Sequence, residues 1–135
     1  MSGRNYNSEI VDNERKYAYG FDFDVMHPYM LRTFSPYFSR GPVLELGPFQ
    51  GAFTSRLIEC FQDITCVEAS TDAIREAQKR PGLQKVVFIN SLFENTVLQR
   101  SYENIFLVHV LEHLNDRVAL LRKIREEWLS NEGYL

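Results

Sequence analysis

Short apolar runs alternate with helical patterns through the second half of the chain and much of the first. The strand-like runs occupy residues 42–46, 64–67, 85–89 and 105–108. Between the first two runs, apolar side chains recur at the spacing of one helix face, at Phe53, Leu57, Ile58 and Phe61. Strands that alternate with helices in this way predict an α/β fold with one parallel sheet flanked by helices.

A further helix is predicted before the first strand. Pro28 suits the first turn of a helix. Met30, Leu31 and Phe34 lie on a plausible apolar face, and the proline at position 36 is expected to end or kink the helix.

The chain divides near residue 40. Residues 1–16 are polar and show no clear period. We therefore predict an N-terminal arm and cap helix over 1–40 and a sheet domain over 41–135.

Two later helices are predicted from their caps. Thr71 can cap a helix that Pro81 and Gly82 stop. The last helix is expected to begin at Asn115 or Asp116. Its inward side chains are expected to be Leu120, Leu121, Ile124 and Trp128.

The predicted sheet is unfinished at the end of the sequence. Residues 131–133 are expected to end the last helix, so that Tyr134 and Leu135 begin a fifth strand. We therefore expect the sequence to be part of a longer chain that carries the last strands.

Composition narrows the class of protein. The 135 residues are 44% hydrophobic and 24% charged, with a net charge of −3, so no basic field attracts nucleic acid. No apolar run approaches the ~20 residues of a membrane-spanning helix, and no secretory signal opens the chain. We expect a soluble cytoplasmic protein with no nucleic-acid or membrane partner. Cys60 and Cys66 are expected to be buried free thiols.

A glycine-bearing turn follows the first predicted strand. Residues 45–51 read Glu-Leu-Gly-Pro-Phe-Gln-Gly and lead into a helix. Glycine lets the backbone approach a ligand closely, and the start of a helix offers free N–H groups. The dinucleotide pattern G-x-G-x-x-G would need glycines at 49 and 52, where Phe49 and Ala52 stand.

The turn resembles motif I of class I S-adenosylmethionine (SAM)-dependent methyltransferases. Glu45, Gly47 and Gly51 match the family pattern of an acid two residues before Gly-x-Gly-x-Gly, whereas Phe49 replaces the middle glycine. The motif tolerates this replacement if Phe49 keeps an ordinary φ. The resemblance implies a Rossmann-like fold, and Pro48 joins these four residues as a cofactor-binding candidate.

Glu68 follows the second predicted strand, 17 residues after Gly51. A carboxylate at this place can accept both hydroxyls of a ribose, as in Rossmann dinucleotide sites. Its position resembles motif II of the same family, with Ala69 beside it. The alternative is a surface glutamate at a strand end.

The resemblance extends past the third and fourth strands. The residues that follow the third strand line the adenine pocket in the family, and here these are Ser91, Leu92 and Phe93. Phe93 could equally belong to the core. The stretch from His109 to His113, His-Val-Leu-Glu-His, resembles one that lies beside the methionine part of SAM. His109 is the one candidate for a catalytic side chain, and it is also a cofactor-binding candidate.

The same stretch matches H-x-x-E-H, an inverted zinc-protease motif. Zinc proteases need that motif inside a helix, with a third ligand further along the chain. His109 follows a strand-like run, and no histidine follows His113. We therefore expect no metal site.

Aromatic residues cluster at 17–23, where a core role competes with a site role. In related enzymes a helix and loop before motif I fold over SAM. Tyr19 and His27 are the matching candidates for a place near the SAM carboxylate.

Together the motifs imply a methyltransferase that transfers the SAM methyl group to a small-molecule or sugar acceptor and releases S-adenosylhomocysteine (SAH). Two alternatives stay open, a NAD(P)-binding domain and a cofactor-binding or non-catalytic interaction module on the same fold. The acceptor, the general base and the oligomeric state, a dimer included, are not determined by the sequence.

Overall fold

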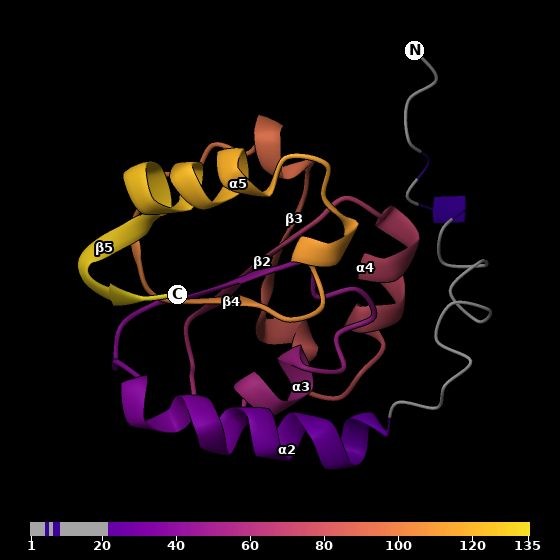
Figure 1. Ribbon diagram of the computed structural model, residues 1–135. Coiled ribbons are helices and arrows are strands. Elements are labelled where there is room, and N and C mark those ends of the chain that lie inside the picture. Colours follow the sequence, from indigo (N-terminus) through magenta and orange to yellow (C-terminus); the bar gives the residue numbers. More distant parts are fainter. Residues whose placement is uncertain (1–4, 6, 9–21) are drawn as a thin grey trace.

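A computed structural model describes residues 5, 7, 8 and 22–135 (Figure 1). Five strands form one parallel sheet in the order β3-β2-β1-β4-β5. They are β1 (Val43–Leu46), β2 (Ile64–Glu68), β3 (Val87–Asn90), β4 (Tyr102–Leu107) and β5 (Leu129–Tyr134). The predicted Rossmann-like α/β sheet is confirmed.

Helices cover both faces of the sheet. They are α2 (Phe23–Phe34), α3 (Thr54–Leu57), α4 (Thr71–Gln78) and α5 (Arg117–Lys123). In Figure 1, α5 lies on one side of the strands, while α2 and α3 lie on the other. Single 3-10 turns connect several elements, at Ser35–Tyr37, Leu83–Lys85, Phe93–Asn95 and Leu111–His113.

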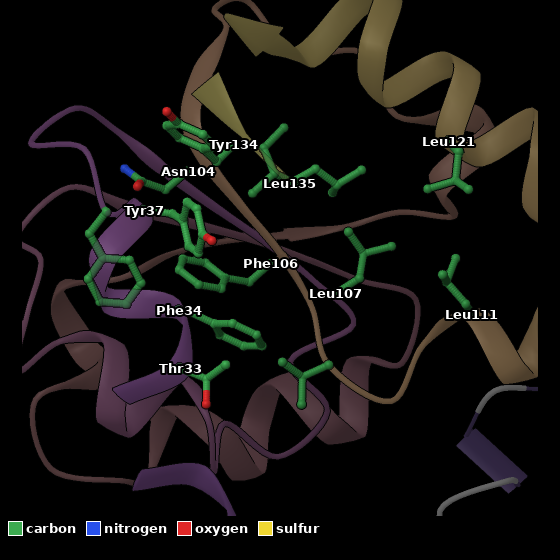
Figure 2. Close-up of a pocket in the computed structure, with 13 residues that line it drawn as sticks. Thr33, Phe34, Tyr37, Asn104, Phe106, Leu107, Leu111, Leu121, Tyr134 and Leu135 are labelled. Atoms are coloured by element: carbon green, nitrogen blue, oxygen red, sulfur yellow. The ribbon is translucent and has the colours of Figure 1, made fainter. Parts of the chain in front are cut away.

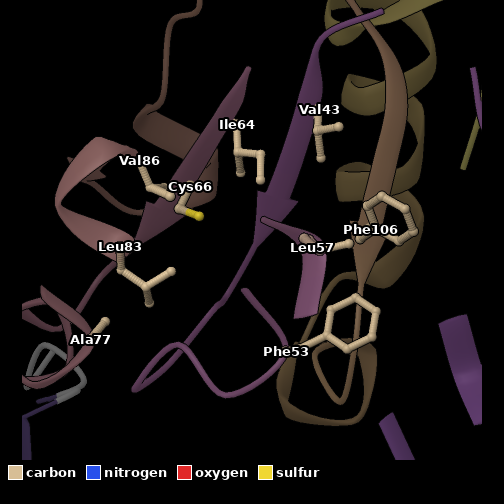
Figure 3. Packing of buried hydrophobic residues seen from close by; sticks show 9 residues of the cluster. All are labelled: Val43, Phe53, Leu57, Ile64, Cys66, Ala77, Leu83, Val86 and Phe106. Carbon is tan, nitrogen blue, oxygen red and sulfur yellow. The ribbon is translucent and has the colours of Figure 1, made fainter. Parts of the chain in front are cut away.

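The two core layers follow from alternation along β1. Val43 packs in a cluster with residues of α3 and α4, whereas Leu44 and Leu46 pack in a second cluster with α5. Figure 3 shows the first cluster between β1, β2, β4 and the helices, with Phe53 and Leu57 beside Phe106. All four side chains of β1 are buried, as expected for a central parallel strand.

The strand order reverses between β1 and β4. The chain runs outward from β1 through β2 to β3 and then crosses back to β4 on the other side of β1. In open α/β sheets, ligands bind outside the carboxyl ends of the strands at such a switch point. The fold therefore brings the turns after β1, β2 and β4 to one edge of the sheet.

The first helix begins earlier than predicted. Asp22 caps α2 by accepting hydrogen bonds from the backbone N–H groups of Asp24 and Val25, so Pro28 lies inside the helix and not in its first turn. The predicted end is correct, because the α-helix stops at Phe34.

The end of the last helix was predicted too late. Asp116 caps α5, which ends in a π-helical turn at Ile124–Trp128 that buries the indole ring. β5 then begins at Leu129, opposite Tyr102 of β4, so residues 131–133 belong to a strand. Pairing with β4 overrides the local turn signal. Leu121 does not face the core, because 36% of its surface is exposed.

Smaller differences concern caps and thiols. Ser70, not Thr71, caps α4, because its side chain accepts the N–H of Ala73. The helix after the glycine turn is short, and its regular part covers only Thr54–Leu57. Cys66 is a buried free thiol as predicted, but Cys60 is exposed.

The strands also shift slightly from their predicted ranges. β3 begins two residues later than expected and β4 begins three residues earlier. Within the part of the chain that the structure describes, no helix is long and apolar enough to span a membrane.

Candidate functional site

The turn after β1 is built on three residues with left-handed backbone. Gly47, Phe49 and Gly51 have φ angles of 69°, 53° and 77°. The condition of an ordinary φ at Phe49 is therefore not met. The turn keeps at position 49 the conformation that glycine adopts most easily, and a side chain there stores about 1–2 kcal/mol of strain.

The two glycines of the turn also leave no room for a side chain. A Cβ atom at Gly47 would lie 2.8 Å from Cγ2 of Val110, which follows β4. A Cβ atom at Gly51 would lie 2.6 Å from Cδ1 of Leu83 and 3.0 Å from Cβ of Ala77 on α4. The glycines therefore allow the turn to pack directly on neighbouring elements. Pro48 is buried between them, and its carbonyl accepts the N–H of Gly51 at 2.9 Å.

Glu68 joins this turn to the start of α4. Its Oε2 accepts the backbone N–H of Phe49 at 3.0 Å, and its Oε1 accepts the N–H of Ser70 at 2.8 Å. The residue is only 8% exposed. Burial raises the pKa of the carboxyl, and the backbone N–H groups of Ser70 and Phe49 oppose that rise.

Glu45 lies under the turn. Its Oε2 accepts a hydrogen bond from the Thr54 hydroxyl at 2.7 Å, and the Cys66 thiol lies 3.7 Å from the same oxygen. The residue is 1% exposed, and this burial raises the pKa of its carboxyl to about 7. In this arrangement Glu45 bonds to the helix that follows the turn, and its predicted contact with a cofactor remains a prediction.

Asn90 at the end of β3 is a residue that sequence reasoning missed. Its Nδ2 donates to the carbonyls of Glu68 and Ala69 at 2.9 and 3.0 Å. The backbone N–H of Ser91 donates to the same Glu68 carbonyl at 3.1 Å. The β2 and β3 ends are therefore tied together. An amide at a strand end, one residue before the predicted pocket, was the available signal.

The residues after β3 reach the glycine turn. Phe93 Cζ lies 3.7 Å from the place where a Cβ of Gly47 would be, and the ring also packs against the core cluster beside α5. Phe93 therefore combines the core role and the position beside the site. Ser91 and Leu92 are half-buried, and the Ser91 hydroxyl donates to the Leu92 carbonyl at 3.0 Å.

His109 follows β4 in a second left-handed conformation, with a φ of 56°. Its Nδ1 lies 3.6 Å from Oε1 of Glu112, a neighbour that the sequence interpretation did not use. Its ring meets the ring of Phe23 on α2 edge-on at 6.2 Å. Strained backbone of this kind clusters at functional sites. Here the two strained non-glycine residues, Phe49 and His109, follow the two strands that flank the switch point.

The N-terminal candidates have different outcomes. His27 is 3% exposed and packs between Phe23 and Phe53, with ring centroids 4.9 and 5.2 Å away. Burial, and then the nearby His109, lower the pKa of His27. It occupies the interface between α2 and the sheet domain. Tyr19 lies outside the described residues.

The metal alternative finds no support in the described residues. No group of three or more potential metal ligands occurs among them. The H-x-x-E-H stretch does not lie in one α-helix, because His109 follows β4 and residues 111–113 form a 3-10 turn.

A cavity of about 590 Å³ borders β4, and no residue of the glycine turn lines it (Figure 2). Its wall is mostly apolar and comes from the end of α2, from β4 and from the end of β5. Figure 2 shows Phe34, Phe106, Leu107, Leu111 and Leu135 around it. The cavity does not include the glycine turn or Glu68, so it is separate from the polar edge of β1 and β2.

A family model described as a methyltransferase domain matches residues 44–135. The chain belongs to this methyltransferase family. The matched range contains the glycine turn, Glu68 and the His109 stretch.

The chain is similar to (S)-coclaurine N-methyltransferase from Thalictrum flavum subsp. glaucum, with 30% identity over 98 residues. The match covers 69% of this chain and 27% of that protein, so the chain spans about a quarter of the relative's length.

Solved structures agree with the fold. A coclaurine N-methyltransferase bound to N-methylheliamine and SAH aligns with a TM-score of 0.67 and 25% identity, over 79% of this chain and 34% of that one. A SAM-dependent methyltransferase from Clostridium acetobutylicum aligns with a TM-score of 0.73 and 16% identity, over 95% and 55% of the two chains. The fold is that of the class I SAM-dependent methyltransferases, which use SAM as methyl donor.

Proposed function

We propose that this chain binds SAM at the carboxyl edge of β1, β2 and β3 and belongs to an enzyme that methylates a small molecule or a sugar. The carrying observation is the environment of Glu68. Its carboxylate is nearly buried, stands at the end of β2, and is oriented by N–H groups from the glycine turn and from the start of α4.

The chemistry of Glu68 fits a ribose. An ionised carboxylate offers about four lone-pair positions, and the backbone N–H groups of Ser70, Phe49 and Ala69 use part of them. The carboxylate therefore keeps capacity for a further donor, which suits a ribose hydroxyl.

The neighbouring residues suit the rest of the cofactor. Gly47 and Gly51 hold a turn without side chains, so the backbone can approach a ligand closely. Ser91, Leu92 and Phe93 follow β3, next to Glu68, and we assign them to the adenine side. Ala69 and Pro48 support the two turns, and Glu45 positions the helix after the turn through Thr54.

When bound, SAM supplies a methyl group on a sulfonium, which passes to a nucleophile and leaves SAH. The chain contributes orientation, which is the main source of acceleration in such transfers. We place His109 on the methionine side, because it follows β4 beside the switch point, and Glu112 lies within 3.6 Å to orient its ring. A general base is required only for a weakly nucleophilic hydroxyl acceptor.

The relative named (S)-coclaurine N-methyltransferase supports a small-molecule acceptor with a nitrogen nucleophile. The apolar cavity beyond β4 is close to the strand that precedes His109, because Val108 contributes to its wall.

Calorimetry with SAM, SAH and NADH tests the cofactor proposal. We expect SAM and SAH to bind and NADH to give no heat of binding. Binding of NADH without binding of SAH would overturn the proposal. Binding of SAH without methylation of any amine or sugar acceptor by the full-length protein would instead favour a non-catalytic module.

A further inference from the structure

A turn near the N-terminus touches the edge of the candidate cofactor site. This N-terminal turn consists of Asn5, Asn7 and Ser8 among the described residues. Asn7 Oδ1 accepts a hydrogen bond from the Ser70 hydroxyl at 2.7 Å. Asn7 Nδ2 donates to the Thr71 hydroxyl at 3.4 Å. The amide therefore binds two successive side chains at the start of α4, more than 60 residues away in the sequence.

The turn has its own local stabilisation. Asn5 Oδ1 accepts the backbone N–H of Asn7 at 3.1 Å and of Ser8 at 3.4 Å. The Ser8 hydroxyl donates to the Asn5 carbonyl at 2.7 Å. These short-range bonds are typical of a capped first helical turn, and they present the Asn7 side chain to α4.

The Asn7 contact continues into the site through Ser70. The Ser70 hydroxyl donates a hydrogen bond to Asn7 and accepts one from the N–H of Ala73, so it acts as both donor and acceptor. The Ser70 backbone N–H donates to Glu68, and the other Glu68 oxygen accepts the N–H of Phe49. One hydrogen-bonded chain thus runs from Asn7 to the glycine turn.

We propose that Asn7 is a positioning residue of the cofactor site, which acts through Ser70 to hold the Glu68 carboxylate in place. This inference rests on the proposed function, because Glu68 is the group that receives the ribose. The N-terminal turn then helps to position the cofactor-binding carboxylate, although it lies far before the first strand in the sequence.

A double-mutant cycle tests the proposal. SAH affinity is measured by calorimetry for the wild type, Asn7→Ala, Glu68→Gln and the double variant. We expect Asn7→Ala to weaken SAH about three- to tenfold, the range that one neutral hydrogen bond supplies. In the Glu68→Gln background the same change is expected to have almost no effect, because the two residues act through one chain of contacts.

The control is Asn131→Ala, which removes an exposed asparagine from β5, and it should leave SAH affinity unchanged. Asn7→Ala should keep a cooperative unfolding transition without ligand, with a loss of stability no larger than about 1.5 kcal/mol, because it removes an acceptor of the buried Ser70 hydroxyl.

The outcomes separate the two proposals. If the wild type fails to bind SAH, the proposed function fails and takes this inference with it. If the wild type binds SAH but Asn7→Ala stays within about twofold of it, only the role of Asn7 is overturned. An equal loss in both backgrounds would also overturn it, since Asn7 would then act independently of Glu68.

Discussion

The two sides of β1 differ in how they hold their side chains. On the β2 side, the nearly buried Glu68 carboxylate accepts hydrogen bonds from the backbone N–H groups of Ser70 and Phe49. On the β4 side, the carboxyl half of β4 borders a mostly apolar cavity of about 590 Å³. The first region offers directional contacts of the kind that the proposed cofactor site requires, and the second offers a mostly apolar surface, whose contacts are non-directional.

Backbone strain is concentrated next to the switch point. Among the described residues, the two non-glycine residues with left-handed backbone are Phe49, in the turn after β1, and His109, after β4, and neither lies within a strand that borders the cavity. Directional bonds can hold a strained turn, because each bond fixes one orientation. Apolar contacts are non-directional and tolerate change more easily. Mutations on the two sides should therefore have unequal effects.

The largest expected effect concerns the buried carboxyl of Glu45. Its pKa rises from 4.5 to about 7 on folding, so the native state binds the proton more tightly than the unfolded state. The stability from this group is complete below about pH 4.5 and is lost as the pH rises to about 7, by about 3 kcal/mol. Glu45→Gln should remove this dependence and stabilise the protein above pH 7.

Urea unfolding at pH 5 and pH 8 measures this difference. The exposed Glu132→Gln serves as the control and should keep the wild-type dependence on pH. The same loss of stability with rising pH in Glu45→Gln and the wild type would show that Glu45 is not responsible.

The next effect concerns the packing of the glycine turn. Gly51→Ala places a Cβ at a φ of 77° and within 2.6 Å of Leu83, so we expect a loss of about 2 kcal/mol in the free energy of unfolding. Gly133→Ala on β5 is the comparison: its Cβ would also be crowded, at 2.8 Å from Leu129 Cδ1, but its φ is not left-handed, so we expect a smaller loss than for Gly51→Ala. Denaturant unfolding of both variants would contradict the argument if Gly51→Ala were as stable as the wild type.

Glu68 is expected to matter for the ligand by a factor of at least ten. Glu68→Gln removes the charged acceptor that we propose for the ribose hydroxyls, and hydrogen bonds to charged groups contribute about 1.5–3 kcal/mol. Calorimetric titration with SAH measures the loss. An affinity equal to that of the wild type would remove Glu68 from the site and leave the polar edge with a structural role only.

Phe49 allows a direct measurement of backbone strain. Phe49→Gly and Phe49→Ala remove the same ring, but only glycine adopts a φ of 53° freely. We expect the glycine variant to be more stable than the alanine variant by about 1 kcal/mol. Thermal unfolding compares the two directly, and equal stabilities would mean that the turn relaxes when the ring is removed.

The smallest effect is expected at the cavity. Leu121→Ser changes a side chain that is 36% exposed and lies on the cavity wall. We expect a change below about 0.5 kcal/mol in stability and none in SAH affinity. A loss of SAH binding in this variant would contradict the separation of the cavity from the polar edge.

Much of the fold could be predicted because local patterns and long-range packing agree. The apolar runs at β1 and β2 lie in the middle of the sheet, where burial on both faces requires nearly continuous apolar sequence. The position of Glu68 at a strand end could be predicted for a similar reason. A polar residue directly after a buried strand must emerge at the carboxyl edge, where parallel strands place their ligands.

Other features were decided by tertiary contacts. The last helix ends at Trp128, because burial of the indole and pairing of Leu129 with Tyr102 outweigh the turn signal at 131–133. The left-handed φ of Phe49 depends on the packing of the flanking glycines and on the bond from its N–H to Glu68.

The sequence by itself therefore determined the class of fold, the order of its strands along the chain and the turn that carries the glycines, since these depend on local periodicity and residue type. Only the tertiary structure decided that Glu45 bonds inward to Thr54, that Asn90 ties β2 to β3, and that Asn7 reaches Ser70. The physical reason is that a hydrogen bond between distant residues depends on where the fold places its donor and acceptor, and no local pattern encodes that distance.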